Sequence, residues 1–117
     1  MFISQSRLNA VLISVLDECR VFRMDVPSGD GVQLRYPLAI WARNGGQTLG
    51  DFDGGAPYQS IRITVLGRDY DEVDRVMQRI VAALKAQGII ENDPAPPTDV
   101  LHEDLDTLGS ETTVLIQ

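Results

Sequence analysis

The residues best suited to bind a metal ion form the run His102-Glu103-Asp104-Leu105-Asp106, which contains the one histidine of the chain. Alternate residues of a β-strand face opposite sides, so only His102, Asp104 and Asp106 could converge on a divalent cation. The other interpretation is a solvated edge strand, whose charges hinder pairing with another sheet. We expect the edge strand and no metal site.

A second acidic motif, Asp51-Phe52-Asp53-Gly54, resembles part of a calcium-binding loop. It lacks the third acidic ligand and the bidentate glutamate of such loops, so we expect no calcium there. The pairs Gly45-Gly46 and Gly54-Gly55 are followed neither by Lys-Ser/Thr nor by the start of a helix. This pattern excludes a phosphate-binding loop or a dinucleotide fingerprint.

The sequence offers no clear nucleophile. Cys19 is the only cysteine, which rules out an internal disulfide. It lies among apolar residues at the end of a predicted helix, so we interpret it as a packed thiol. A cysteine nucleophile also needs a base, and His102 is the only imidazole. The sequence therefore predicts a protein that is not an enzyme and needs no cofactor.

The composition is that of a folded, acidic protein. The 117 residues include 17 acidic and 10 basic side chains, for a net charge of −7, and a chain of this length is expected to form one domain, residues 1–117. Such a surface repels phosphate backbones, which argues against sequence-independent binding of nucleic acid. No apolar run approaches the roughly 20 residues of a membrane span, and the first residues lack a signal-peptide pattern. We expect a soluble protein made in a reducing cytoplasm.

Hydrophobic periodicity predicts two helices and a set of short strands. The first helix covers residues 6–19. The second follows a capping box from Asp69 to Glu72, buries a stripe from Val73 to Leu84 and ends near Gly88. Strands are expected at 21–26, 38–43 and 58–66, briefly at 89–91, and at 99–106 and 112–117 with a turn at Gly109. A glycine-rich loop at 44–57 and a proline-rich connector at 92–97 lie between them.

Runs of adjacent strands with only two helices are typical of the α+β class. We expect a two-layer sandwich, in which a mainly antiparallel sheet carries both helices on one face.

An exposed patch on the other face of this sheet is the main candidate for function. Trp41 falls on the face of its strand opposite Leu38 and Ile40, and Leu66 falls on the face opposite Ile63. If the helices cover the face that carries Leu38, Ile40 and Ile63, Trp41 and Leu66 lie on the uncovered face. Tryptophan and arginine are typical of interface centres. The other interpretation is that a loop or the C-terminal hairpin covers Trp41. The candidate subunit or partner interface consists of Trp41, Arg43, Phe52, Tyr58, Arg62 and Leu66.

Several short motifs occur in a characteristic order along the whole chain. They are Asp25-Val26-Pro27, Tyr36-Pro37, Ala56-Pro57-Tyr58 before a strand, Gly67-Arg68-Asp69-Tyr70-Asp71-Glu72-Val73 before a helix, and Glu103-Asp104-Leu105-Asp106 before a last strand. In this order the chain resembles the tail terminator family (tail completion or minor tail proteins) of long-tailed bacteriophages and gene transfer agents.

The resemblance implies a small α+β structural protein of the virion that forms a homo-hexameric ring. Such a ring binds the last ring of tail tube protein and caps the tube. It thereby ends tube polymerisation and offers a surface to the neck and head-completion proteins. DNA passes through its lumen without specific binding. The family has no catalytic residues to carry over, and we expect no metal or cofactor in this chain. The resemblance implies a place in the tail or neck, after assembly in the host cytoplasm. The glycine-rich segment from Asn44 to Gly55 departs from the family pattern and does not indicate a partner.

Other functions remain open from the sequence. Another neck component, such as a head–tail connector or stopper, would share this shape. A homo-oligomeric, ligand-sensing regulatory module of ferredoxin-like topology would have a βαββαβ order, whereas here a helix comes first and two strands come last. A hydrolase is disfavoured by the single histidine.

Overall fold

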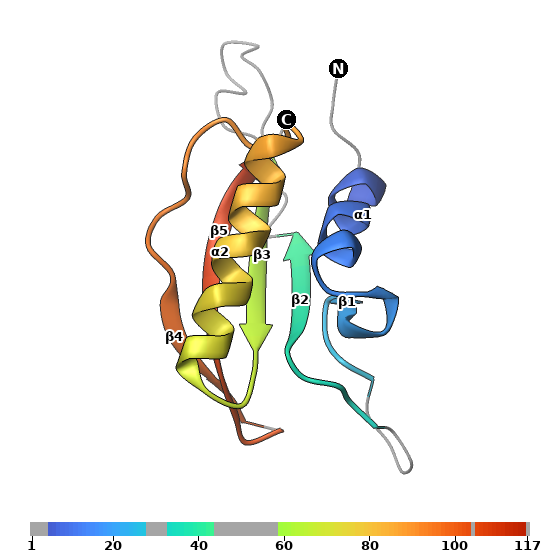
Figure 1. The fold of residues 1–117 in the computed structure, drawn as a ribbon, viewed down its shortest axis with the longest axis vertical. Helices are drawn as coiled ribbons and strands as arrows, with labels where there is room; N and C mark the ends of the chain where they lie inside the picture. Colours follow the sequence, from blue (N-terminus) through green and yellow to red (C-terminus); the bar gives the residue numbers. More distant parts are fainter. Residues whose placement is uncertain (1–4, 28–32, 44–58, 104, 117) are drawn as a thin grey trace.

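The computed structural model describes residues 5–27, 33–43, 59–103 and 105–116 (Figure 1). The glycine-rich segment at 44–57 lies outside the described residues. In chain order, the elements are α1 (Gln5–Val15), the short 3₁₀ helix η1 (Glu18–Arg20), β1 (Val21–Arg23), β2 (Leu38–Arg43), β3 (Gln59–Leu66), α2 (Tyr70–Ala86), β4 (Thr98–His102) and β5 (Thr107–Ile116).

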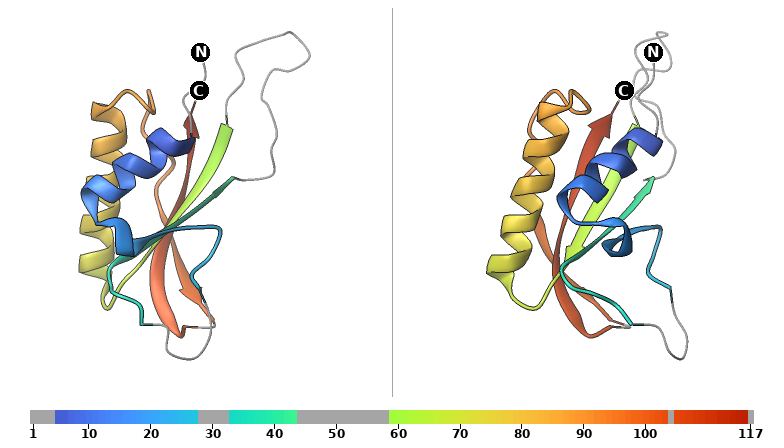
Figure 2. Two further views of the ribbon diagram at one scale, coloured as in Figure 1. Left: turned by 90° about the vertical axis from the view of Figure 1, so that its right-hand side faces the viewer. Right: turned by 45° about the vertical axis from the view of Figure 1, so that its right-hand side comes forward.

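The strands form one five-stranded sheet in the order β1-β2-β3-β5-β4. β1 runs parallel to β2, and the other three neighbouring pairs are antiparallel. Figure 2 shows α1 and α2 side by side on the same face of this sheet. The predicted α+β fold, a mainly antiparallel sheet with both helices on one face, is confirmed.

The main core lies between the two helices and the sheet. Apolar residues three and four positions apart place one side of each helix against the sheet, and alternate residues of β2, β3 and β5 meet them. The helices contribute Leu8, Val11 and Leu12 from α1 and Val73, Val76, Met77, Ile80 and Leu84 from α2. Burial of one such side chain stabilises the fold by about 1.5–3 kcal/mol.

A smaller apolar cluster lies on the face of the sheet opposite the helices, which we call the far face. Its buried members are Leu38 and Ile40 of β2 and Leu66 of β3. Partly buried side chains from the segments around β1, β2 and the β4–β5 turn pack against them: Phe22, Val26, Leu34, Tyr36 and Leu105. Loops, rather than a helix, thus cover this part of the far face.

The predicted cap of the second helix is present. The Asp69 carboxylate accepts a hydrogen bond of 2.8 Å from the backbone N–H of Glu72, and Asp69 itself has extended backbone angles. At the other end, Gly88 has a φ of +71°, which glycine adopts at little cost just beyond a helix.

We expect Asp69→Ala to lower the free energy of unfolding by about 1 kcal/mol, because it leaves a first-turn N–H without its acceptor. Urea denaturation followed by circular dichroism measures the loss. Asp69→Asn keeps an acceptor oxygen and should retain most of the stability. Equal stability of the alanine variant and the wild type would contradict the cap.

The first helix ends earlier than the sequence predicts, at Val15 rather than residue 19. The Asp17 carboxylate then accepts a 2.9 Å hydrogen bond from the N–H of Cys19 and begins η1, a local bond that competes with continued helix. Cys19 is exposed, so the interpretation as a packed thiol is wrong. β1 is also shorter than predicted, because Met24 has a φ of +73°, outside the range of a strand.

The C-terminal hairpin turns between His102, where β4 ends, and Thr107, where β5 begins, not at Gly109. Asp106 has a φ of +48°, and its N–H donates to the carbonyl of Glu103 at 3.2 Å. Gly109 lies inside β5, where a side chain would collide with the neighbouring strand. Residues 89–91 form no strand, although Ile89 and Ile90 are buried in the main core.

Candidate interaction surfaces

Trp41 and Leu66 do not lie where the sequence predicts. Trp41 stands opposite Ile63 in the β2–β3 register and faces the helices, with 3% of its surface exposed. Leu66 stands opposite Leu38 on the far face and is fully buried. The prediction that Trp41 and Leu66 share an uncovered face is therefore wrong: they face opposite sides, and both are covered.

The composition of β2 explains this error. The strand alternates between two sets of residues that are both largely apolar, so its pattern does not reveal which set meets the helices. The register decides it, because Trp41 pairs with Ile63, whose strand face also carries Ile61 and Val65. Leu38 and its alternates then fall on the far face.

The two arginines of the predicted interface are both exposed, but they lie on opposite faces of the sheet. Arg43 pairs with Ile61 and shares the helix face, whereas Arg62 pairs with Ala42 on the far face. Phe52 and Tyr58 lie outside the described residues. The structure therefore separates the predicted patch into at least two places.

A basic patch lies beside α1 and over Trp41. The indole Nε1 of Trp41 donates to the Asn9 side chain at 2.9 Å, and the guanidinium of Arg23 lies over the ring, 5.2 Å from its centre. Arg43 borders the same depression, of about 520 Å³. We call Arg23 and Arg43, with the Trp41 ring beneath them, the basic patch.

A groove of about 820 Å³ runs along the other helix, between α2 and the proline-rich connector. Met77 and Val81 of α2 line one wall, and Pro94 and Pro97 of the connector line the other. Lys85 crosses between the walls, with its Nζ 2.9 Å from the Asp93 carboxylate. We call this depression the α2 groove. It lies beside β4, at the edge of the sheet away from the basic patch.

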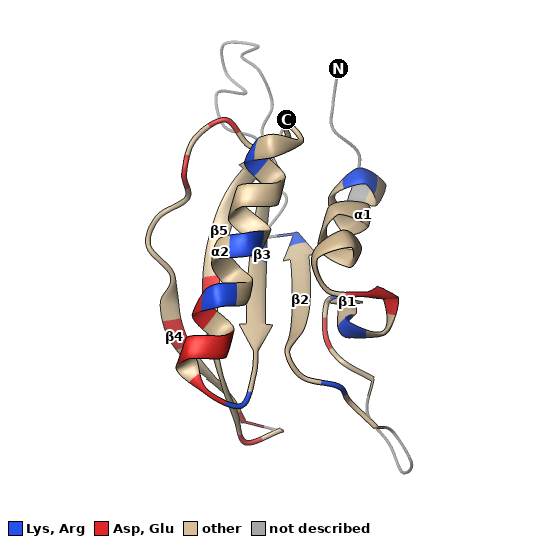
Figure 3. Cartoon of the chain, viewed as in Figure 1, with Lys and Arg blue, Asp and Glu red and all other residues tan. Residues whose placement is uncertain are grey.

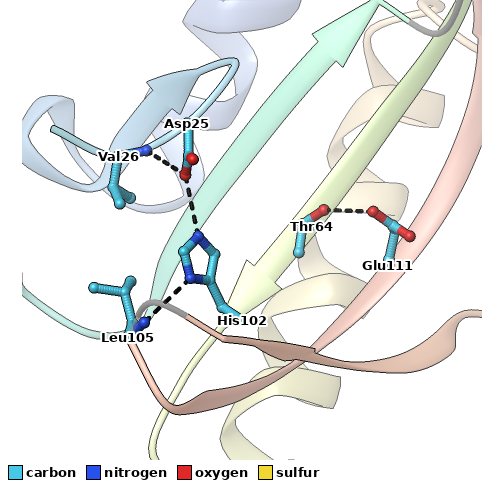
Figure 4. Close-up of polar contacts among 6 residues, drawn as sticks. All are labelled: Asp25, Val26, Thr64, His102, Leu105 and Glu111. Atoms are coloured by element: carbon cyan, nitrogen blue, oxygen red, sulfur yellow. Dashed lines mark hydrogen bonds and ion pairs between the residues drawn. The ribbon is translucent and has the colours of Figure 1, made fainter. Parts of the chain in front are cut away.

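A polar network occupies the far face beyond its apolar cluster (Figure 4). Thr64 Oγ1 donates to Glu111 Oε1 at 3.0 Å. Arg62 Nε lies 3.3 Å from the same oxygen. These residues border a cavity of about 230 Å³, together with Asp25 and His102.

His102 links the two edge strands of the sheet across this cavity. Its Nε2 lies 3.1 Å from the Asp25 carboxylate, and its Nδ1 accepts a hydrogen bond from the N–H of Leu105 at 3.4 Å (Figure 4). Since Nδ1 accepts, the proton of the neutral ring is on Nε2, which donates to Asp25. Asp25 follows β1 and His102 ends β4, so this bond joins the opposite edges of the sheet.

The hydrogen bond to Asp25 involves His102, the histidine of the run from His102 to Asp106 that the sequence offers as a metal site. β4 ends at His102, so strand alternation does not continue to Asp106 in the turn. Asp104 and the Asp51-to-Gly54 motif lie outside the described residues. Among the residues that the structure describes, no group of three His, Cys, Asp or Glu side chains is placed to hold a metal ion.

Asp25 should make a pH-dependent contribution to stability. The hydrogen bond from His102, followed by that from the Val26 N–H, holds the pKa of Asp25 below its ordinary value of 3.8, while desolvation acts in the opposite direction. A carboxylate whose pKa is lower in the folded state contributes stability above its unfolded pKa and loses it as the pH falls through the folded pKa. The wild type should therefore be more stable than Asp25→Asn at about pH 5, and the difference should shrink towards about pH 2. Urea titrations across this range measure it, and a difference that does not vary with pH would refute the linkage.

Comparison with known proteins adds no family assignment. No protein-family model matches the chain, and no curated protein sequence matches it. In the described part of the chain, no helix is long and apolar enough to cross a membrane. Function is therefore inferred from the fold, its surfaces and the sequence pattern.

Proposed function

We propose that this protein is a tail terminator of a bacteriophage or gene transfer agent, a structural subunit that forms a hexameric ring on the end of the tail tube. The ring ends polymerisation of the tube protein and provides the surface to which neck and head-completion proteins join. The role depends on binding between proteins and involves no catalysis. The proposal locates the protein in the tail or neck of the particle, after assembly in the host cytoplasm.

The arrangement of helices and sheet carries this proposal. The resemblance in sequence implies an antiparallel sheet with two helices, and the chain has a five-stranded, mainly antiparallel sheet with α1 and α2 on one face. The element order also differs from that of a ferredoxin-like regulatory module, because α1 precedes β1 and two strands follow α2.

Two further features support assembly into a ring. β1 and β4 are the edge strands, and each pairs with only one neighbour in the part of the chain described. Contact with another subunit is one way to protect such edges. The net charge of −7 also suits a lumen through which DNA passes without being held.

Native mass spectrometry across a wide concentration range, with negative-stain images of the most concentrated sample, tests the proposal. We expect a mass of six subunits and ring-shaped particles. A stable dimer at every concentration would contradict the proposal and favour the regulatory module.

A subunit that closes its ring only on the tube end would remain a monomer in this experiment, so a second assay is needed. The protein is added to growing tubes of the tail tube protein, and tube lengths are measured by electron microscopy. We expect capped tubes that stop growing. Unchanged tube growth, together with no ring in solution, would overturn the proposal, and binding only to tubes that are already capped would favour another neck component.

A further inference from the structure

The α2 groove is negatively charged on both sides. Asp74 of α2 and Asp99 of β4 border it, and both side chains are exposed. Neither forms an ion pair with another described residue, whereas Asp93 is neutralised by Lys85. In Figure 3, acidic residues lie on α2, the connector and β4, the three segments that line this groove. The groove therefore presents two uncompensated carboxylates above an apolar floor that includes Met77.

The basic patch has the opposite charge. Arg23 and Arg43 are exposed, and neither is ion-paired with a described residue. The nearby acids Asp17 and Asp25 are engaged elsewhere, with Arg20 and His102 respectively. The stacking on the Trp41 ring holds Arg23 in place, which reduces the entropy lost when it binds an anionic partner.

The two surfaces lie at opposite edges of the sheet but on its same side. Asp99 pairs with Ser110, which pairs with Val65 of the helix-facing core, so Asp99 faces the helix side at the β4 edge. Arg23 pairs with Trp41, so it faces the same side at the β1 edge. A contact between the β4 edge of one copy and the β1 edge of the next is head-to-tail, which is the type of interface that builds rings.

We infer that the α2 groove receives the basic patch of a second copy of this chain, with Arg43 and Arg23 opposite Asp99 and Asp74. This inference rests on the proposed function and specifies its subunit interface.

Complementary charge favours a second copy over other occupants. Two chains of net charge −7 repel each other at long range, so a stable contact needs local pairing of opposite charges. Leu101 adds an apolar contact at the same edge, because it lies two residues beyond Asp99 on the same side of β4 and is 60% exposed.

Charge reversal gives a specific test of head-to-tail pairing. Asp99→Arg places an arginine in the groove where it meets Arg43 of the next copy, and Arg43→Glu places a glutamate in the patch where it meets Asp99. Each variant alone should assemble at least about tenfold more weakly than the wild type, because like charges meet at every interface. An equal mixture of the two should assemble again, because alternating subunits place opposite charges at every interface. Native mass spectrometry should then show even-numbered rings that contain both variants in equal amounts.

Matched controls separate this effect from net charge and folding. Glu103→Arg and Arg68→Glu make the same changes in charge at exposed positions outside the groove and the patch, and both should assemble as the wild type does. Circular dichroism verifies that all variants are folded.

The outcomes distinguish this inference from the proposed function. Rings that form normally from either variant alone would overturn the inference and leave the proposed function standing. A mixture that does not assemble better than its components would also overturn it. A wild type that stays monomeric at every concentration would overturn it too, and the tube-capping assay would then decide the proposed function.

Discussion

Replacing Gly109 with alanine should lower the free energy of unfolding by about 3 kcal/mol, at the upper end of the usual range for overpacking. A Cβ at this position would lie 2.5 Å from the carbonyl oxygen of Val65 and 2.6 Å from the Cδ2 of Leu66. The first of these atoms belongs to the backbone of the central strand β3, so it cannot move aside without disturbing the sheet. Urea denaturation of the variant and the wild type measures the loss.

Gly88→Ala is the matched control. Gly88 has a φ of +71°, but its missing Cβ would meet nothing within 4 Å. The substitution should cost about 1 kcal/mol, from the left-handed backbone alone. If the two alanine variants were equally stable, close packing at Gly109 would not be the reason for glycine there.

The second large effect is expected for Trp41→Ala, with a loss of about 3–5 kcal/mol. The indole is almost fully buried between β2 and α1, and its removal leaves a cavity and an unpaired Asn9 side chain. Because Trp41 is the only tryptophan, unfolding of the variant must be followed by circular dichroism rather than by tryptophan fluorescence.

Trp41→Phe separates packing from hydrogen bonding. It retains most of the ring volume and loses the 2.9 Å bond to Asn9, so it should cost about 1 kcal/mol. If the Trp41→Ala protein were folded and as stable as the wild type, Trp41 would not be a core residue. That result would favour the exposed interface that the alternation in β2 first suggests.

The sequence predicts well those elements that have apolar residues on one side and polar residues on the other. In α2, the apolar stripe, the Asp69 cap and the terminal glycine all agree, and the helix forms as expected. In β3, the strict alternation that contains Ile61 and Ile63 identifies both the strand and its buried face. β2 is predicted with the correct bounds, but its face is not, because both of its sides are apolar.

The surfaces depend on register and on contacts between distant segments, which local patterns do not contain. Asp25 and His102 are 77 residues apart, and they meet because the segment after β1 brings Asp25 to the end of β4 on the far face. Glu111 meets Thr64 because β3 and β5 pair in one particular register. The α2 groove likewise depends on the path of the connector, which its prolines mark as extended without fixing its direction.

The position of Lys85, which bridges to Asp93 in the α2 groove, offers a way to count the free ends of an assembly. Lys85 carries the only side-chain amine of the sequence, and it lies in the α2 groove. An amine-acylating reagent therefore modifies one side chain, and peptide mass spectrometry reports the modified fraction. If each groove receives the next subunit, a closed ring protects every lysine, whereas an open chain leaves one reactive lysine at its free end. The yield of acylated Lys85 would then tell a ring from a filament without an image of either.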